Sequence, residues 1–168
     1  TIYTKGQNNQ YQGSLTFNGE SDFITLDANK ISEQLNQNSF SIGVWIKPNL
    51  DNTNNIYSKS KPIFSLFKNS ISNNKVSLEI IYDYVSSVFK LRFSFYNNYV
   101  EETTYYLKMA QHSGLDDWIY VLITYNDFDK KKSIYVNGKL LASNNTGYPI
   151  ISNATQCYIG YKNEVLDN

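Results

Sequence analysis

The chain has 168 residues, enough for one domain with a buried core and too few for two domains of ordinary size. Fifteen basic and fifteen acidic residues give a formal net charge of zero, whereas nucleic-acid binding would need a basic stripe. The one basic run, Lys130–Lys132, is more simply a solvated turn. No run of about eighteen apolar residues is present. The sequence therefore predicts neither nucleic-acid binding nor direct membrane insertion.

The composition favours β-structure. Fifteen Tyr, nine Phe and two Trp make the chain rich in aromatic residues, which fit half-buried, pleated surfaces. Ala, the best helix former, is scarce. Cys157 is the only cysteine, so the chain has no internal disulfide. Its strand-like neighbours predict that Cys157 is buried as a small hydrophobic side chain.

Short apolar runs with period-two alternation recur along the chain, separated by clusters of Asn, Asp, Ser and Gly. This pattern predicts strands joined by turns. Only Ala28–Leu35 looks helical. In chain order, the expected strands are Ser14–Phe17, Phe23–Leu26, Phe40–Lys47, Ile63–Phe67, Val76–Tyr82, Phe89–Tyr96, Tyr105–Met109, Trp118–Tyr125, Ser133–Val136, Lys139–Ala142 and Cys157–Gly160.

Two Asn-Gly pairs mark expected hairpins. Asn18-Gly19 and Asn137-Gly138 each lie between two strand-like runs. Asn-Gly is the strongest short-range signal for a two-residue hairpin turn, because both of its residues tolerate a positive φ. We therefore expect the strands on either side of each pair to be hydrogen-bonded to one another.

Alternation along the longer strands predicts which side chains face the core. Leu91, Phe93 and Phe95 occupy every second position, so they should lie on one buried face. The strand Trp118–Tyr125 shows the same alternation. Trp45 and Trp118 each lie among Ile and Val residues, and we assign both to the core.

Eleven strands with almost no helix predict an all-β fold, either a sandwich or a barrel. With no internal repeat and no visible domain boundary, residues 1–168 are expected to form a single domain. The chain stops soon after its last expected strand, whereas a sandwich usually needs a final strand that returns beside the first. We therefore expect this chain to be a fragment of a longer protein, attached to further domains.

Five segments in a characteristic order resemble a known family, the laminin-G-like domains with a concanavalin A-like jelly roll. They are an opening hairpin, a tryptophan strand ending in Pro, a second tryptophan strand, the hairpin after it and a late Ile-Gly strand: Gly13–Gly19 with Phe23–Leu26, Phe40–Pro48, Trp118–Tyr125, Ser133–Leu140 and Tyr158–Gly160. The resemblance implies a two-sheet antiparallel jelly-roll sandwich that lacks its closing strand. The same five segments, with their Tyr- and Asn-rich composition, also resemble the lectin-like jelly roll in the receptor-binding half of clostridial neurotoxins, which is largely a structural and accessory binding element.

Calcium is the one cofactor that stays open. Asp116 and Asp117 precede Trp118, and calcium-binding laminin-G-like domains are similar in placing an acidic residue in this rim region. Calcium prefers oxygen ligands gathered in loops, and Asp51–Asn55 and Asp127–Asp129 are two further oxygen-rich loops. None of the three has a defined ligand spacing, so polar turns in an Asn-rich chain are the alternative interpretation.

The residues needed for catalysis do not form a recognisable pattern. His112 is the only histidine, and no Gly-x-Ser-x-Gly segment provides a nucleophile. Glycosidases need two carboxylates facing one another. Glu79 and Asp83 share a strand face but have the apolar Ile81 between them. The sequence therefore predicts that the chain is not an enzyme.

Sugar binding needs an aromatic surface for the ring's C–H face, beside amides or carboxylates for the hydroxyl groups. Two Tyr-rich segments supply both kinds of side chain and could face a common ligand. The alternative is that their rings coat a solvated sheet face. The candidate ligand-binding residues are Tyr82, Asp83, Tyr84, Tyr96, Asn97, Asn98 and Tyr99.

These observations favour a non-catalytic module that recognises a glycan or a protein partner, as lectin-like adhesion domains of secreted proteins do. We expect it to be extracellular or surface-displayed. Asn144 and Asn153 begin glycosylation acceptor sequences, which matter only on a eukaryotic or viral secretory route. Two alternatives remain open: a structural jelly roll within a larger toxin, adhesin or capsid-like assembly, and a glycoside-active enzyme on the same fold.

Overall fold

The computed structural model describes residues 2–4, 13–18, 21–36, 39–47, 61–67, 75–83, 88–96, 100–107, 118–145 and 154–160. All eleven predicted strands are present. The strand expected at Tyr105–Met109 begins earlier in the chain and is longer than predicted, and the structure contains one further short strand near the N-terminus. The elements are β1 (Ile2–Thr4), β2 (Ser14–Thr16), β3 (Phe23–Thr25), α1 (Ala28–Leu35), β4 (Phe40–Ile46), β5 (Lys61–Phe67), β6 (Lys75–Asp83), β7 (Val88–Tyr96), β8 (Val100–Leu107), β9 (Ile119–Asn126), β10 (Lys131–Val136), β11 (Lys139–Asn144) and β12 (Gln156–Gly160).

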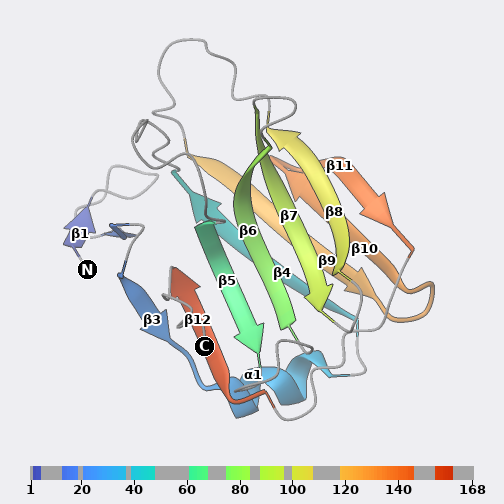
Figure 1. Ribbon diagram of the computed structural model, residues 1–168, viewed down its shortest axis with the longest axis horizontal. Coiled ribbons are helices and arrows are strands. Elements are labelled where there is room, and N and C mark those ends of the chain that lie inside the picture. Colours follow the sequence, from blue (N-terminus) through green and yellow to red (C-terminus); the bar gives the residue numbers. More distant parts are fainter. Residues whose placement is uncertain are drawn as a thin grey trace.

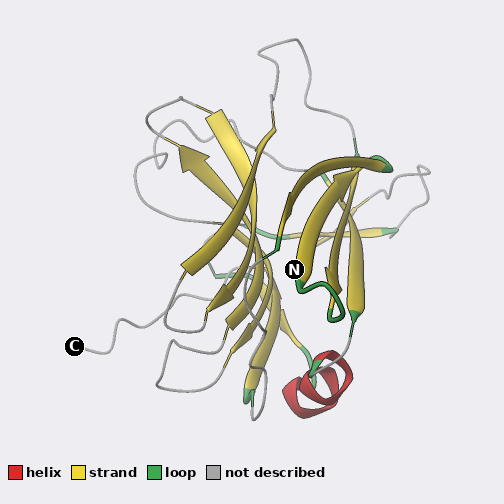
Figure 2. Ribbon diagram, turned by 90° about the vertical axis from the view of Figure 1, so that its right-hand side faces the viewer, coloured by secondary structure: helices red, strands yellow, loops and turns green. Residues whose placement is uncertain are grey.

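The strands form two main antiparallel sheets that face one another. The larger sheet has the order β3-β12-β5-β6-β7-β8, and the smaller has the order β11-β10-β9-β4. Figure 1 looks onto the six-stranded sheet, with the four-stranded sheet behind it. Figure 2 shows the two layers from the side. This arrangement confirms the predicted all-β, jelly-roll sandwich.

The helix α1 lies at one end of the sandwich, below the ends of β12 and β5 (Figure 1). Asp27 caps it, because its carboxylate accepts a hydrogen bond of 3.1 Å from the Lys30 backbone N–H. Ala28 and Leu35 are buried against the core. Within the described residues, no helix is both long and apolar enough to cross a membrane.

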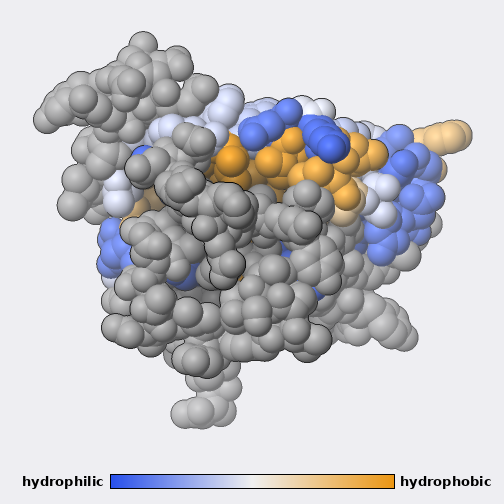
Figure 3. All heavy atoms as spheres, turned by 90° about the horizontal axis from the view of Figure 1, so that it is seen from above, coloured by the Kyte–Doolittle hydropathy of each residue, from blue (hydrophilic) through white to orange (hydrophobic). Residues whose placement is uncertain are grey.

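The core lies between the two sheets and consists of alternate residues from each. On β7, Leu91 and Phe93 are fully buried, and so are Val121 and Ile123 on β9. The predicted burial of these two strands is therefore confirmed. Phe93 packs edge-on against Phe95, with 5.1 Å between the ring centroids. Viewed from above, apolar atoms gather in a band bordered by hydrophilic ones (Figure 3).

The two Asn-Gly pairs behave differently. Asn137 and Gly138 have φ values of 49° and 79° and join β10 to β11, as a type I′ hairpin turn requires. The hairpin predicted at Asn18-Gly19 is wrong, since β2 pairs with β1 whereas β3 pairs with β12. Instead, the Asn18 side chain accepts hydrogen bonds from the backbone N–H groups of Ser21 and Asp22, at 2.9 and 3.0 Å. These bonds form a turn that connects strands of different sheets.

The lysine run is only partly a solvated turn. β10 begins at Lys131, so Lys132 is the strand residue opposite Tyr125 and shares the inward face with Ile134. Its side chain is fully buried, and its ammonium lies 4.9 Å from the centroid of the Phe95 ring. The prediction of a solvated lysine is therefore wrong for Lys132, because strand alternation directs this side chain into the sandwich.

Cys157 lies in the core with no exposed surface, as the sequence predicts. Burial raises the pKa of its thiol to about 11. Folding therefore holds the thiol protonated over a range in which the unfolded chain, with a pKa of about 8.5, loses its proton. The contribution to stability is full below about pH 8.5 and is lost as the pH rises towards 11.

We expect Cys157 to resist iodoacetamide in the folded protein and to react once urea unfolds it, because the thiolate is the reactive form. The measurement is the extent of alkylation by mass spectrometry at about pH 8, with the urea-unfolded protein as the positive control. Rapid alkylation of the folded protein would show that the strand β12 opens readily.

Candidate functional site

Trp45 is exposed on the outside of the four-stranded sheet, not buried. Its side chain is 45% accessible, so its assignment to the core is wrong. Burial alternates along β4, with Phe40, Ile42, Val44 and Ile46 on the half-buried face. Residues i−1 and i+1 of a strand point to the opposite face, so apolar neighbours on both sides place Trp45 outside. The sequence alone indicates this outward position, because Trp45 lies on the same face of the strand as the polar Ser41.

Tyr120 lies beside Trp45 on the neighbouring strand. The two residues are paired in the β4–β9 register, and their ring centroids are 5.2 Å apart. Gly43, the next outward residue of β4, has no side chain, and the Tyr120 hydroxyl occupies that place. A Cβ atom at position 43 would collide with this hydroxyl. The glycine thus allows the Tyr120 ring to lie along the sheet next to an exposed indole.

The backbone of Tyr120 is held by the β10–β11 turn. The Tyr120 N–H donates to the Asn137 side-chain oxygen, and the Asn137 N–H donates to the Tyr120 carbonyl, both at 2.9 Å. Asn137 has the positive φ of a type I′ turn. This residue therefore forms the turn and also holds the backbone of Tyr120. The Tyr120 ring therefore projects from a backbone position that is fixed by two hydrogen bonds.

The apolar surface continues across the sheet in the next row of the register. Gly43 pairs with Leu122, Leu122 with Tyr135, and Tyr135 with Leu140, which is 47% exposed. Together these residues form a surface that we call the aromatic platform: Trp45, Tyr120, Leu122, Tyr135 and Leu140.

A row of hydroxyl groups borders the aromatic platform. In the register, Ser41 pairs with Thr124, Thr124 with Ser133, and Ser133 with Ser143, so the row crosses all four strands. Ser41 and Ser143 are exposed, Thr124 is half-buried and Ser133 is buried. We call these four residues the hydroxyl row. An aromatic surface beside hydroxyl groups presents both contacts that a sugar needs, one for its C–H face and one for its own hydroxyls.

Lysines lie at two edges of this face. Lys47 follows Trp45 at the next outward position of β4, and Lys131 pairs with Asn126 beyond the hydroxyl row. Among the described residues at outward positions of the four-stranded sheet, none is acidic.

The outer face of the six-stranded sheet is less accessible. Its central positions hold polar residues that are nearly or fully buried: Ser65 is 5% exposed, Ser77 0%, Glu79 4% and Ser94 5%. Glu79 is paired in the register with Arg92. Because these described positions carry only buried polar side chains, whereas Trp45 and Leu140 are exposed, the aromatic platform with the exposed members of the hydroxyl row is the better candidate site.

The Tyr-rich segments predicted to bind sugar lie at opposite ends of the β6–β7 hairpin. The antiparallel register places Tyr82 opposite Phe89 and Tyr96 opposite Lys75. The two rows are seven residue steps apart, a distance of about 23 Å along the strands. One small ligand therefore cannot contact both segments. Tyr84, Asn97, Asn98 and Tyr99, like Asp116, Asp117 and His112, lie outside the described residues, so their roles stay predictions.

The loop at Asp127–Asp129 forms a hydrogen-bonded turn. The Asp127 carboxylate accepts from the Lys130 ammonium at 2.8 Å and from the Tyr125 hydroxyl at 3.0 Å. The bond from Lys130 is the main reason that the pKa of Asp127 is lowered. A bound ammonium competes with a cation for this oxygen. No group of three or more potential metal ligands occurs among the residues that the structure describes.

Comparisons with known proteins agree on the architecture. The sequence profile of the concanavalin A-like lectin/glucanases superfamily, of the laminin G type, matches residues 18–168. No curated protein sequence gives a significant match. Among solved structures, the carbohydrate-binding module CBM40 of the Ruminococcus gnavus IT-sialidase, bound to α2,3-sialyllactose, is similar with a TM-score of 0.59 and 12% identity. The similarity covers 83% of this chain and 74% of that chain.

The same module bound to α2,6-sialyllactose gives a TM-score of 0.58 at 10% identity, over 83% of this chain and 75% of that one. At these identities the structural similarity supports the fold alone. The profile match, by contrast, covers most of the chain and accords with the two-sheet sandwich described above. The chain belongs to the concanavalin A-like lectin/glucanase superfamily.

Proposed function

We propose that this domain is a non-catalytic glycan-binding module, and that the aromatic platform with the hydroxyl row is its binding surface. The observation that carries the proposal is Trp45, a large aromatic side chain that is 45% exposed, paired with Tyr120 and bordered by a row of hydroxyl groups. The similar solved structures are carbohydrate-binding modules, which supports the same class of ligand.

In this proposal the ligand's apolar ring face stacks on Trp45, and its hydroxyl groups exchange hydrogen bonds with Ser41 and Thr124. Stacking of a planar base on an aromatic side chain contributes about 1–3 kcal/mol, and we use the same order of magnitude for the C–H face of a sugar ring. Tyr and Trp supply such contacts at a low entropic cost, since each has only two side-chain torsions. Binding would therefore need little rearrangement of the sheet.

An acidic glycan is the first ligand to test. Lys47 supplies a cation two residues beyond Trp45, and the similar modules were solved with sialyllactose, a carboxylated sugar. A cation beside the platform would favour a carboxylate and would make binding weaker at high salt. A module of this kind would act outside the cell or at its surface, where such glycans are displayed.

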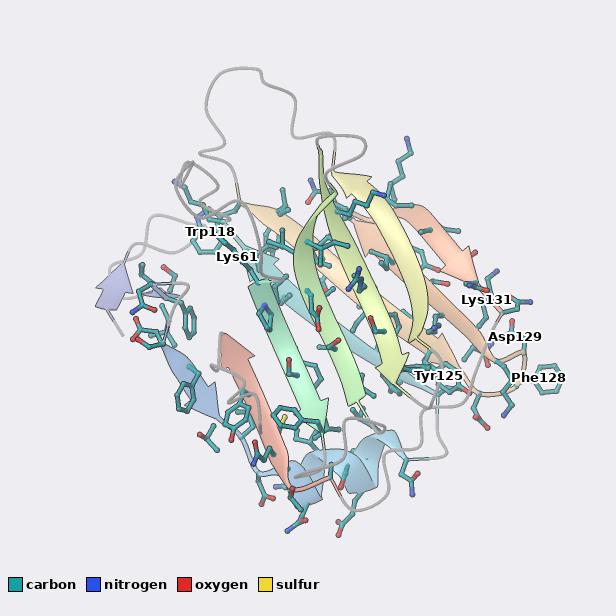
Figure 4. All side chains as sticks on the ribbon, in the orientation of Figure 1. Lys61, Trp118, Tyr125, Phe128, Asp129 and Lys131 are labelled. Atoms are coloured by element: carbon teal, nitrogen blue, oxygen red, sulfur yellow. The ribbon has the colours of Figure 1, made fainter. Side chains whose placement is uncertain are left out.

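Replacing Trp45 by Ala should weaken the binding of α2,3-sialyllactose by about 5- to 150-fold, the equivalent of about 1–3 kcal/mol. The measurement is isothermal titration calorimetry. Phe128→Ala is the matched control, because Phe128 is also aromatic and is 96% exposed. It lies at the tip of the β9–β10 turn and points away from the sheets (Figure 4). Its removal should leave the affinity unchanged.

Equal losses in the two variants would remove Trp45 from the site. A glycan array with the wild-type domain, with and without calcium, extends the test to other ligands. No retention of any glycan would contradict the proposed function. New reducing ends after incubation, still present after repurification, would instead show an enzyme.

A further inference from the structure

The aromatic platform extends well beyond Trp45 and Tyr120. Tyr135 and Leu140 lie on β10 and β11, in the row of the register next to the Trp45–Tyr120 pair. Tyr135 has the opposite parity to the fully buried Ile134, so it belongs to the outer face. Leu140, its neighbour across the β10–β11 pair, is 47% exposed. The apolar surface thus crosses the whole four-stranded sheet.

The register gives the length of this surface. Trp45 on β4 and Tyr135 on β10 are two strands apart and two residues apart along the strands. With a strand spacing of about 4.8 Å and a rise of about 3.4 Å per residue, their Cα atoms are roughly 12 Å apart. One pyranose ring is too small to stack on both side chains. A ligand that contacts both must contain at least two linked sugars.

Between these two side chains the surface is largely apolar and includes one hydroxyl group. Gly43 contributes no side chain, the Tyr120 hydroxyl lies over it, and Leu122 is the next residue across the sheet. The hydroxyl row runs parallel to this path, from Ser41 to Ser143. A linear sugar chain laid across the strands would therefore keep a largely apolar surface beneath it. It would meet the hydroxyl groups of Ser41, Thr124 and Ser143 along one side, whereas Ser133 is buried.

We propose that the domain binds an extended oligosaccharide across the four strands of the sheet, with one sugar on Trp45 and a second on Tyr135. This inference rests on the proposed function and deepens it. It names the ligand class as an oligosaccharide of two or more units, as opposed to a single terminal sugar. Tyr135 is then the residue that distinguishes a longer oligosaccharide from a single sugar.

The test compares α2,3-sialyllactose with lactose and with free N-acetylneuraminic acid, each titrated by calorimetry into the wild-type domain and into Tyr135→Ala and Tyr135→Phe. In the wild type, the trisaccharide should bind about 5- to 150-fold more tightly than the free monosaccharide. Tyr135→Ala should bring this ratio towards one. Tyr135→Phe should keep it, because a phenyl ring still stacks.

Phe128→Ala is the surface control, and thermal unfolding of each variant checks that the fold is intact. Equal affinities of the wild type for the trisaccharide and the monosaccharide would overturn the inference while leaving the proposed function standing. The same follows if Tyr135→Ala keeps the wild-type ratio. Binding of none of the three sugars, together with no glycan retained on the array, would overturn both.

Discussion

Replacing Phe93 by Ala should lower the free energy of unfolding by about 3–5 kcal/mol, the usual cost of truncating a buried aromatic side chain. Phe93 is fully buried, and its ring packs edge-on against Phe95 at 5.1 Å and Phe40 at 6.4 Å between centroids. Its strand is paired on both sides, with β6 and with β8. The surrounding backbone therefore has little freedom to collapse into the cavity, and the loss should be near the upper end of the range.

Urea unfolding followed by circular dichroism measures this loss. Trp45→Ala is the matched control, since it removes an aromatic side chain from an outward position. It should cost no more than about 1 kcal/mol, the value of a cross-strand aromatic pair. If the two variants were equally destabilised, Trp45 would be part of the core and the aromatic platform would not exist.

Gly160→Ala should destabilise the domain by about 2–4 kcal/mol, because strain and steric collision add. Gly160 has a φ of 86°, which is unfavourable for any residue with a Cβ. A Cβ there would also come within 2.7 Å of the Phe17 ring and 2.8 Å of the Asp22 carbonyl oxygen. The carbonyl is part of the backbone and cannot move aside like a flexible side chain.

Gly138→Ala separates the two causes. Gly138 has a similar φ of 79°, but a Cβ there would have no atom within 4 Å. Its replacement should cost only the backbone strain, about 1–2 kcal/mol. Equal losses at the two positions, measured as the shift in urea midpoint, would mean that Phe17 and Asp22 accommodate the methyl group at no cost.

The local sequence pattern was sufficient to predict the strands and one of the two hairpins. Alternation identified the buried faces of β7 and β9, and the hairpin at Asn137-Gly138 was predicted from its two residues. The same dipeptide at Asn18-Gly19 failed as a hairpin, because β3 instead pairs with β12, which lies more than a hundred residues away in the sequence. Such pairing depends on contacts that no local window contains.

The candidate site was missed for two different reasons. For Trp45 the information was present, since its apolar neighbours on β4 must face the other way. The hydroxyl row is different. Ser41, Thr124, Ser133 and Ser143 become a row only through the register of four strands. The identity of an aromatic residue also does not show whether its side chain is exposed, and so the sequence favoured the Tyr-rich segments.

Mapping the bound ligand by nuclear magnetic resonance tests the central claim most directly. The domain is titrated with α2,3-sialyllactose while backbone amide and indole resonances are followed. The largest shifts should cluster at Trp45, Tyr120 and Thr124, on the outer face of the four-stranded sheet. Shifts that cluster on the six-stranded sheet, with the Trp45 indole resonance unchanged, would contradict the proposed binding surface.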